Sequence, residues 1–341
     1  MFLHFFVSFF ITFFTCTFAL QYTGVNEAGL EFDGAKEYCA PQPDSIKNFK
    51  NQGHNVFRIP FLWEEVQTCI RCDLNYEYLN ALDKVVDYVL SIGGIALIDC
   101  HNYFRYYGHL VDPNDTDSFA NLWYRLAGHY KNNNNIWFGL MNEPHDMQTE
   151  TVQKFHQQAI WAIRGLGNTN KIIVSGNGWD SLTQWSVSNP YYGTSNTILG
   201  SLDDPSHNFM FEMHLYFDYD YSGTHADCTS IDWNLIQQTT NWLRSVKKQA
   251  IVTEFGLGNN DNCVYNYGEP FLNFLNTNKD VWTGYTYWSA GPCWPNDYIY
   301  TIDPHNGIPS SDHRVQLLAK YSAVKNNLRT SSLNQTISQH P

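Results

Sequence analysis

Two glutamates, Glu143 and Glu254, are the residues most clearly placed to do chemistry in this sequence. Each ends a short apolar run, at 137–141 and 250–252, and each stands shortly before a Pro or a Gly. An acid at the C-terminal end of such a run would point inward at the mouth of a parallel barrel. Two carboxylates on opposite sides of one pocket are what cleavage of a glycosidic bond requires. The sequence therefore predicts a pair of catalytic acids.

Further polar and aromatic residues stand at the ends of other apolar runs: Arg58, His101, Asn142, His214, Tyr216 and Trp288. Singly, each has an ordinary explanation, since an arginine can pair with a surface acid and a histidine or aromatic ring can belong to the core. Together they are hard to explain by packing, because burying so many titratable groups near one another costs free energy without a purpose. We therefore expect them to surround the two acids.

The elements that must position these residues are short apolar runs separated by helical stretches. The best-marked helix is 76–92, whose apolar residues form one stripe and which stops at Gly93. Strand and helix alternating eight times are the pattern of a single-domain α/β fold, the (β/α)8 TIM barrel. The predicted strands are 21–26, 56–60, 95–100, 136–141, 172–175, 209–214, 250–253 and 282–288. Weaker helical patterns cover 119–130, 152–166, 233–246 and 271–275.

The chain begins with an apolar segment, residues 1–19, which ends in small residues at the two positions that a signal peptidase reads. We interpret it as a secretory signal peptide, with a membrane anchor as the alternative because the run is near the lower length limit for a span. No second such run follows, so we expect a secreted, extracellular protein with no membrane contact after cleavage. Residues 20–328 are then the catalytic domain, and 329–341 form a polar tail.

The composition argues against some partners. The net charge is −13, with 20 Lys+Arg against 33 Asp+Glu and no basic run, so a nucleic-acid or anionic-membrane surface is not expected. Aromatic residues make up 16% of the chain, including 11 Trp and 22 Tyr, and flat amphipathic rings suit the mixed CH and OH faces of sugars. For any single ring, however, a place in the core is the better interpretation.

The cysteines fit an oxidising compartment. Of 8 cysteines, Cys16 would leave with the signal peptide. If His101 faces the barrel mouth, alternation turns Cys100 toward the helices as a buried free thiol. The others allow up to three disulfides. Cys69 and Cys72 could be half a zinc site or a redox pair, but no second such pair exists and a structural disulfide is favoured.

Two sequons, at Asn114 and Asn334, are candidate glycosylation sites and agree with secretion.

Several segments resemble glycoside hydrolase family 5, and within it the fungal-type endoglucanases. The likeness runs from about Gln21 to Ala290, and Cys39, Cys69, Cys72 and Cys293 are not explained by it, so their pairing stays open. The matching sequence motifs are DCHNY at 99–103, NEPHD at 142–146, GNGW at 176–179, HLY at 214–216, SGTHADC at 222–228, TEFG at 253–256 and YW at 287–288.

The resemblance implies a role for each acid. Glu143 would be the general acid and then the base, and Glu254 the nucleophile, kept ionised by Arg58 and by a hydrogen bond from Tyr216. Asn142 would bond the sugar 2-OH. The histidines at 101 and 214 would contact sugar hydroxyls or tune the carboxylates.

The resemblance also implies substrate contacts and one disulfide. Trp288 would form the floor of the subsite for the attacked sugar, and Trp179 would stack on the leaving-group side. Asn102 and Tyr103 belong to the same third-strand phrase and are candidate substrate contacts. Cys228 would pair with Cys263, because the resemblance places them on the loops after strands six and seven.

The sequence thus predicts a monomeric, retaining endo-β-1,4-glucanase acting on a β-glucan polysaccharide without metal or cofactor. An endo-β-1,4-mannanase is the alternative, since loop contacts decide which 2-OH configuration is accepted. His101, His214 and the two glutamates lack the local spacing of known metal motifs, and the glycine pairs at 165–167 and 256–258 lack the third glycine of a nucleotide loop. A non-catalytic sugar-binding barrel would use the aromatics without the acids.

Overall fold

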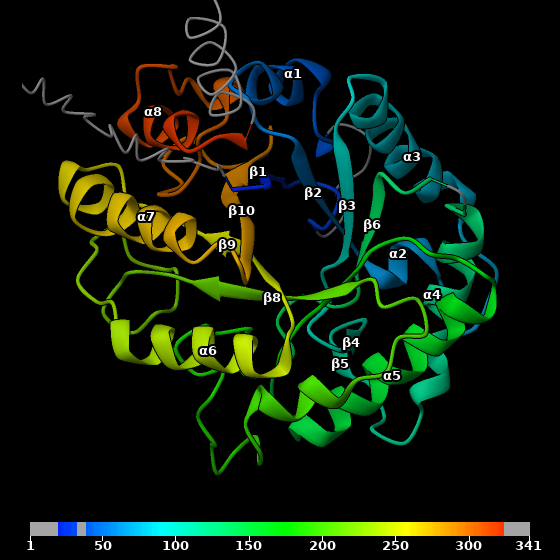
Figure 1. Ribbon diagram of the computed structural model, residues 1–341. Helices are drawn as coiled ribbons and strands as arrows, with labels where there is room; N and C mark the ends of the chain where they lie inside the picture. The colour runs from blue at the N-terminus through cyan, green and yellow to red at the C-terminus, as the bar shows by residue number, and fades with distance from the viewer. Residues whose placement is uncertain (1–19, 33–38, 132, 324–341) are drawn as a thin grey trace, which may run out of the picture.

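The computed structural model describes residues 20–32, 39–131 and 133–323. Within them, parallel strands close into a barrel in the order β1-β10-β9-β8-β7-β6-β3-β2, and helices surround it (Figure 1). The predicted barrel is confirmed, and each predicted strand is found within two residues of its predicted ends. The barrel strands are β1 (Tyr22–Glu27), β2 (Val56–Phe61), β3 (Ile95–Cys100), β6 (Ile136–Gly139), β7 (Ile172–Val174), β8 (Phe209–Leu215), β9 (Ala250–Phe255) and β10 (Trp282–Ala290).

Four of the helices, α3, α4, α6 and α8, begin where a side chain accepts from a free backbone N–H group. Asn75 caps α3 by accepting from the N–H of Glu77, and Asp232 caps α6 by accepting from the N–H groups of Asn234 and Leu235. The helices are α1 (Pro43–Asn51), α2 (Trp63–Val66), α3 (Tyr76–Ser91), α4 (Thr116–His129), α5 (Thr149–Gly165), α6 (Trp233–Val246), α7 (Glu269–Thr277) and α8 (His313–Lys320). Of these, α1, α2 and α8 were not predicted.

Alternation along the strands divides the barrel interior into an apolar and a polar layer. The apolar layer is a cluster of buried residues: Val56, Leu97, Trp137, Ile173, Met210 and Ile251. Two residues further along four of these strands, the position with the same orientation is polar and fully buried: Arg58, Asp99, Glu212 and Thr253. The polar layer therefore lies toward the C-terminal ends of the strands, which is where barrel enzymes place their sites.

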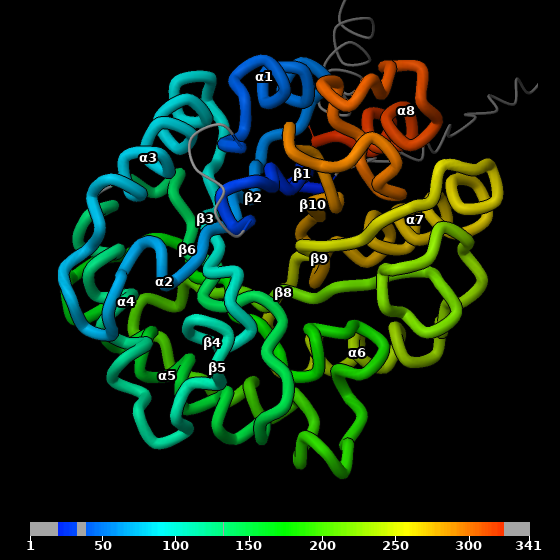
Figure 2. The backbone as a smooth tube through the Cα atoms, turned by 180° about the vertical axis from the view of Figure 1, so that it is seen from behind, coloured from blue at the N-terminus to red at the C-terminus, as the bar shows by residue number. Residues whose placement is uncertain are grey.

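The two ends of the described chain meet beside one another. The first and last strands, β1 and β10, pair in parallel, and the backbone N–H of Ala323 donates to Thr23 Oγ1 at 2.9 Å. Viewed from behind, α1 and α8 lie side by side (Figure 2). Ser45 of α1 also donates to Asp303 at 2.8 Å.

Among the residues that the structure describes there are three disulfides, and the sequence had left the pairing of two of them open. Cys39 joins Cys293, and Cys69 joins Cys72 rather than serving as half of a zinc site. Cys228 joins Cys263, the pair that the family resemblance implied. Cys100 is a buried free thiol, as alternation predicted.

Some predictions fall on other parts of the chain. The proposed signal peptide (1–19), the sequon at Asn334 and the polar tail (329–341) lie outside the described residues. Among the residues that are described, none of the helices is both long and apolar enough to cross a membrane. A short hairpin, β4 (Arg105–Tyr106) with β5 (His109–Leu110), was not predicted.

Candidate active site

Glu254 lies near the end of β9, where a bulge changes the pairing with β8. Met213 pairs with Val252, but the next residue, His214, pairs with Glu254, so Thr253 is the extra residue. Strict alternation would send Thr253 and Glu254 to opposite faces of the sheet. The bulge lets both side chains reach the barrel interior, where Thr253 contacts His214 and Glu254 contacts Arg58.

Arg58 of β2 is completely buried, and its guanidinium contacts several side chains of the polar layer. Its Nη1 donates to Glu254 Oε1 and to Asn26 Oδ1, both at 2.7 Å. Its Nη2 donates to Asn142 Oδ1 at 2.7 Å and lies 3.1 Å from Asp99 Oδ2. Burial lowers the pKa of Arg58, but the carboxylates of Asp99 and Glu254 outweigh it and raise the pKa above its usual value. The guanidinium therefore stays charged and holds a cation against one oxygen of Glu254.

The second oxygen of Glu254 accepts from Tyr216, whose hydroxyl lies 2.8 Å from Oε2. Tyr216 is buried and stacks on Tyr300, with ring centroids 5.6 Å apart. Burial, and then the charge of Glu254, raises the pKa of Tyr216 well above its usual value, so the phenol remains a donor. Each oxygen of Glu254 thus has a hydrogen-bond donor, Arg58 on Oε1 and Tyr216 on Oε2.

Glu143 follows β6 and adopts a left-handed backbone conformation with φ of 45°. Its N–H donates to Asp180 Oδ2 at 2.9 Å, which holds this uncommon conformation in place. Burial raises the pKa of Glu143 to about 7, although the positive charges of His101 and Arg58 oppose the shift. A carboxyl group with this pKa keeps its proton in mildly acidic solution, as a general acid must.

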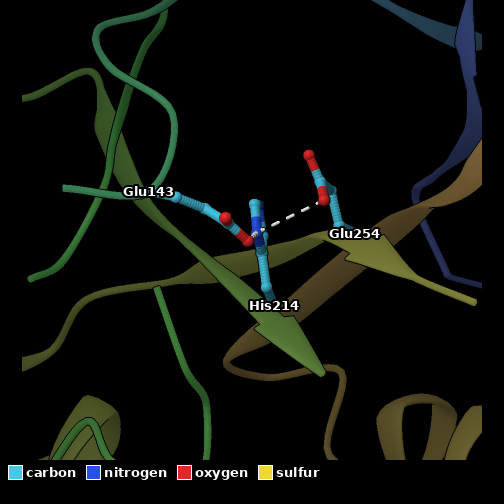
Figure 3. Close-up of side chains that lie close together, drawn as sticks. All are labelled: Glu143, His214 and Glu254. Atoms are coloured by element: carbon cyan, nitrogen blue, oxygen red, sulfur yellow. Dashed lines mark hydrogen bonds and ion pairs between the residues drawn. The ribbon is translucent and has the colours of Figure 1, made fainter. Parts of the chain in front are cut away.

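His214 of β8 stands between the two glutamates, which point toward it (Figure 3). Its Nδ1 lies 2.7 Å from Glu143 Oε1 and 3.5 Å from Glu254 Oε2, and its Nε2 lies 3.0 Å from Thr253 Oγ1. Burial lowers the pKa of His214 to about 4, so the ring is neutral at higher pH. One oxygen from each glutamate and one ring nitrogen all lie within 4.8 Å of one another.

Asn142 and His101 form a second polar group beside Arg58. Asn142 Nδ2 donates to His101 Nε2 at 3.2 Å, and His101 Nδ1 lies 2.8 Å from Asp99 Oδ2. Burial lowers the pKa of His101, but the hydrogen bond to Asp99 outweighs it and leaves the pKa raised. With its oxygen held by Arg58 and its amide by His101, Asn142 is fixed in orientation next to Glu143.

Two tryptophans stack on histidines of the candidate site and its surroundings. Trp288 stacks on His101 with ring centroids 5.5 Å apart, and its Nε1 donates to Tyr298 at 2.8 Å. Trp179 stacks on His145 at 4.7 Å and is 46% exposed. A cavity of about 550 Å³ extends from Glu143 past Trp179, and its further lining includes Gln184, Asn189, Tyr191, Tyr192, His214, Tyr216 and Tyr221.

The structure brings most of the candidate residues together. Tyr103 packs edge-on against His101, with ring centroids 5.5 Å apart. Asn102 instead has its side chain engaged by the start of α2, where its oxygen accepts from the N–H of Trp63 at 2.6 Å and its amide donates to Glu64. These two partners account for the burial of Asn102 without a ligand.

Sequence reasoning missed Asp99, Asp180, Glu212 and Thr253 as members of the site. A signal was present for two of them, because Asp99 and Glu212 each stand two residues before an inward-facing histidine, on the same face of the strand. Asp180 gave no such signal, since it reaches the N–H of Glu143 from a loop after β7.

The group Glu143, His214 and Glu254 could in principle hold a metal ion. Each member, however, already has a protein partner, and the guanidinium of Arg58 lies 2.7 Å from Glu254. A second cation beside Arg58 would be repelled, so these residues fit a metal poorly.

Comparison with known proteins identifies the family of this chain. The family model for cellulase, glycosyl hydrolase family 5, matches residues 18–291. The chain is 37% identical over 298 residues to a probable endo-β-1,4-glucanase B of Neosartorya fischeri, covering 84% of this chain and 87% of that protein. It is 36% identical over 304 residues to endoglucanase gh5-1 of Neurospora crassa, covering 86% of this chain and 75% of that protein.

Solved structures agree with the sequence comparisons. An endo-β-1,4-glucanase from Xanthomonas axonopodis pv. citri superposes with a TM-score of 0.82 at 34% identity, covering 89% of this chain and 99% of that chain. XacCel5A in complex with cellopentaose superposes with a TM-score of 0.83 at 34% identity and the same coverage. Since the family model spans nearly the whole barrel and the relatives match over most of their length, this chain belongs to glycosyl hydrolase family 5, the cellulase family.

Proposed function

We propose that the chain is an endo-β-1,4-glucanase that hydrolyses internal bonds of cellulose or a related β-glucan with retention of configuration. The observation that carries this proposal is the contrast between two neighbouring carboxyl groups. Glu254 has the Arg58 cation and the Tyr216 hydroxyl on its two oxygens, whereas burial raises the pKa of Glu143 to about 7. One group is therefore suited to attack and the other to protonate.

The reaction follows from these two environments. Glu143 donates its proton to the glycosidic oxygen while Glu254 attacks the anomeric carbon, and the leaving sugar departs as an alcohol. Glu143, now ionised, removes a proton from water, which displaces Glu254 and restores both groups. One oxygen of Glu143 lies within 4.8 Å of one oxygen of Glu254, and this closeness favours the narrow, retaining separation of the carboxyl groups over the wider one that accommodates a water.

The neighbouring side chains support this chemistry. Asn142, held by Arg58 and His101, is placed to bond the sugar 2-OH, a contact that strengthens in the transition state. We assign Trp288, with Tyr103 and His101 beside it, to the attacked sugar. Trp179, in the cavity that runs from Glu143, serves the leaving-group side.

The choice of a β-1,4-glucan rests on the relatives. Proteins named endo-β-1,4-glucanase match most of this chain, and XacCel5A is solved with cellopentaose. We also propose that the protein is secreted, with a signal peptide at 1–19, a catalytic domain at 20–328 and glycosylation at Asn114 and Asn334. Asn114 is exposed at the turn before α4, and three disulfides agree with an oxidising compartment.

A polysaccharide panel tests the proposal. Carboxymethyl cellulose and mixed-linkage β-glucan should lose viscosity quickly relative to the appearance of new reducing ends. Proton NMR of the first-formed products should detect β-anomers. Faster hydrolysis of β-1,4-mannan than of the glucans would move the assignment to a mannanase, and first-formed α-anomers would rule out retention.

A further inference from the structure

A line of hydrogen bonds runs from Glu143 into the barrel and ends at a buried acid, Glu212. Glu143 Oε1 lies 2.7 Å from His214 Nδ1, and His214 Nε2 lies 3.0 Å from Thr253 Oγ1. Thr253 Oγ1 lies 2.8 Å from Glu212 Oε2. Glu212 belongs to the inner polar layer, beneath the carboxylates that would face a substrate, and it is completely buried. Its contact with the cleft therefore passes through Thr253 and His214.

The hydrogen bonds in this line can run in either of two opposite directions, depending on which groups carry the protons. A threonine hydroxyl has one proton, so Thr253 donates either to Glu212 or to His214. If Glu212 is ionised, Thr253 donates to it, the neutral ring carries its proton on Nε2, and a bare Nδ1 faces Glu143. If Glu212 is protonated, it donates to Thr253, which donates to Nε2, and the ring then presents an Nδ1–H to Glu143.

The surroundings of Glu212 favour the protonated form. Its Oε1 is buried without a hydrogen-bond partner, which is costly for a charged group. Burial raises its pKa to about 8; Asp99 and Glu254 act in the same direction, and Arg58 and the hydrogen bond with Thr253 act against it. The Arg58 guanidinium lies 3.8 Å from Oε2, but its nearer contacts are with Glu254 and Asp99.

A further buried acid, Asp180, lies beside this line of hydrogen bonds. Glu212 raises the pKa of the buried Asp180 carboxyl, after burial itself. Asp180 also accepts from the N–H groups of Glu143 and Gly176. Several buried acids thus share one guanidinium, and full ionisation of all of them would leave uncompensated negative charge.

We propose that Glu212, in its protonated form, is a positioning residue that fixes the His214 tautomer through Thr253, so that His214 always donates from Nδ1 to Glu143. This inference rests on the proposed role of Glu143 as the acid/base. Since Oε1 then accepts from His214, the catalytic proton of Glu143 is carried on Oε2. When Glu143 has given up this proton, the same Nδ1–H stabilises the carboxylate, so a single tautomer serves both halves of the reaction.

Nitrogen NMR of histidine-labelled protein reads the tautomer directly. The His214 signals, assigned by their loss in His214→Gln, should show a protonated Nδ1 and a bare Nε2 at pH 6. Thr253→Val, which keeps the shape of the side chain without the hydroxyl, should lose this preference. Thr253→Ser should keep it. A protonated Nε2 in the wild type would overturn the proposal.

Kinetics separate a positioning role from a purely structural one. Two substrates are used: phenyl β-cellobioside, whose leaving group needs a proton, and 2,4-dinitrophenyl β-cellobioside, whose leaving group does not. Glu212→Leu should lower kcat/KM about tenfold or more for the phenyl substrate and about threefold or less for the dinitrophenyl one. Glu212→Gln, whose amide can donate to Thr253 as the protonated acid does, should restore most of the loss.

The outcomes distinguish this inference from the proposed function. If Glu143→Ala impaired both substrates equally, the acid/base assignment itself would fail. If Glu143→Ala were selective but Glu212→Leu impaired both substrates equally, Glu212 would be structural only. If Glu212→Gln lost as much phenyl activity as Glu212→Leu, the ionised form of Glu212 would be the working one. Either of the last two results overturns the proposal while leaving Glu143 in its role.

Discussion

The carboxyl group of Glu254 is hydrogen-bonded to the Arg58 guanidinium and the Tyr216 hydroxyl, whereas that of Glu143 contacts the neutral imidazole of His214. Both side chains are carboxylates of the same length, so the difference between them is supplied by their neighbours. The guanidinium of Arg58 stabilises charge on one, and desolvation opposes charge on the other. The assignment of acid and nucleophile is therefore a property of the surrounding residues, and it can be tested one glutamate at a time.

The first prediction separates the two glutamates by azide rescue. Glu254→Ala removes the nucleophile, so hydrolysis should stop, and azide in the vacated space should attack an activated β-glycoside once and give an α-glycosyl azide. Glu143→Ala should still form the intermediate from an activated substrate, and azide should then release a β-glycosyl azide after two inversions. Product configuration is read by NMR, and azides of the opposite configuration would reverse the two roles.

The second prediction concerns the stacking platform. Trp179→Ala should weaken binding of cello-oligosaccharides by about 1 kcal/mol, roughly fivefold in Kd, with a smaller effect on the turnover of aryl cellobiosides. Trp161→Ala is the matched control, because Trp161 is 47% exposed on α5, against 46% for Trp179, and does not line the cavity. Isothermal titration with inactive Glu254→Ala protein measures both, and equal losses would remove Trp179 from the subsite.

At the scale of elements, the close approach of neighbouring strands depends on glycine. Gly24 of β1 lies against β2, where an added Cβ would fall 1.6 Å from the carbonyl oxygen of Val56. Such an overlap with backbone cannot be relieved by a rotamer change. Gly165, at the end of α5, is the opposite case, because a Cβ added there would meet nothing within 4 Å.

The third prediction uses this contrast. Gly24→Ala should lower the free energy of unfolding by about 3 kcal/mol or more, because β1 must move away from β2. Gly165→Ala should raise it by about 0.5 to 1 kcal/mol, since alanine restricts the unfolded chain and favours the helix. Chemical denaturation of both variants measures the difference. Similar stabilities for the two would show that β1 can move at little cost.

The strands were predictable from sequence because each is an apolar run that ends in a polar residue, and the alternation of Leu97, Asp99 and His101 is readable without a structure. The place of Glu254 at a strand end was predictable too, but the inward orientation of both Thr253 and Glu254 was not, because the bulge at Thr253 breaks alternation and no sequence pattern marks it. The helix α1 was missed because it starts at Pro43 without a side-chain cap and buries only a short apolar stripe.

For the whole molecule, the buried acids couple stability to pH. The folded-state pKa values of Glu31 and Glu143 are raised to about 7 and that of Glu212 to about 8, and burial also raises the pKa of Glu27. At these four acids the folded chain therefore binds more protons than the unfolded chain between about pH 4.5 and pH 8, whereas His156 and His214, whose pKa values burial lowers to about 3 and about 4, act in the opposite direction below about pH 6.5. Stability is fully present below about pH 4.5 as far as the four acids are concerned, and it is lost as pH rises through about 7 and 8.

The fourth prediction follows from this loss of stability with rising pH. The melting temperature should fall between about pH 5 and pH 8 at constant ionic strength, by roughly 1.5 °C for each 1 kcal/mol of lost stability. Glu27→Gln should reduce the slope, because Glu27 is buried with neither oxygen hydrogen-bonded and lies outside the proposed reaction. Differential scanning calorimetry measures both proteins. A melting temperature that rises with pH over this range would contradict the prediction.

The single barrel could be predicted from eight strand-like runs with five helical stretches between them, but its long-range closure could not. The number of cysteines indicated disulfides but not which cysteines pair. The pairing of Cys39 with Cys293 depends on β1 and β10 lying side by side. The inward orientation of Glu212 was readable from its strand, but its contact with Thr253 and that of Asp180 with Glu143 could not be predicted, because the partners come from separate strands and loops and meet only after folding.

The Cys39–Cys293 disulfide has a mechanical consequence. It joins residues 254 positions apart, so β2 to β10 and both glutamates lie inside one covalent ring. An oxidised molecule pulled by its two ends carries the force through the sulfur–sulfur bond, while β1, α8 and the short 3₁₀ helix Pro304–Asn306 are the described elements outside the ring. At about 3.4 Å per extended residue, roughly 860 Å of chain is shielded from stretching. Reduction of one bond would release that length, with the catalytic pair in it.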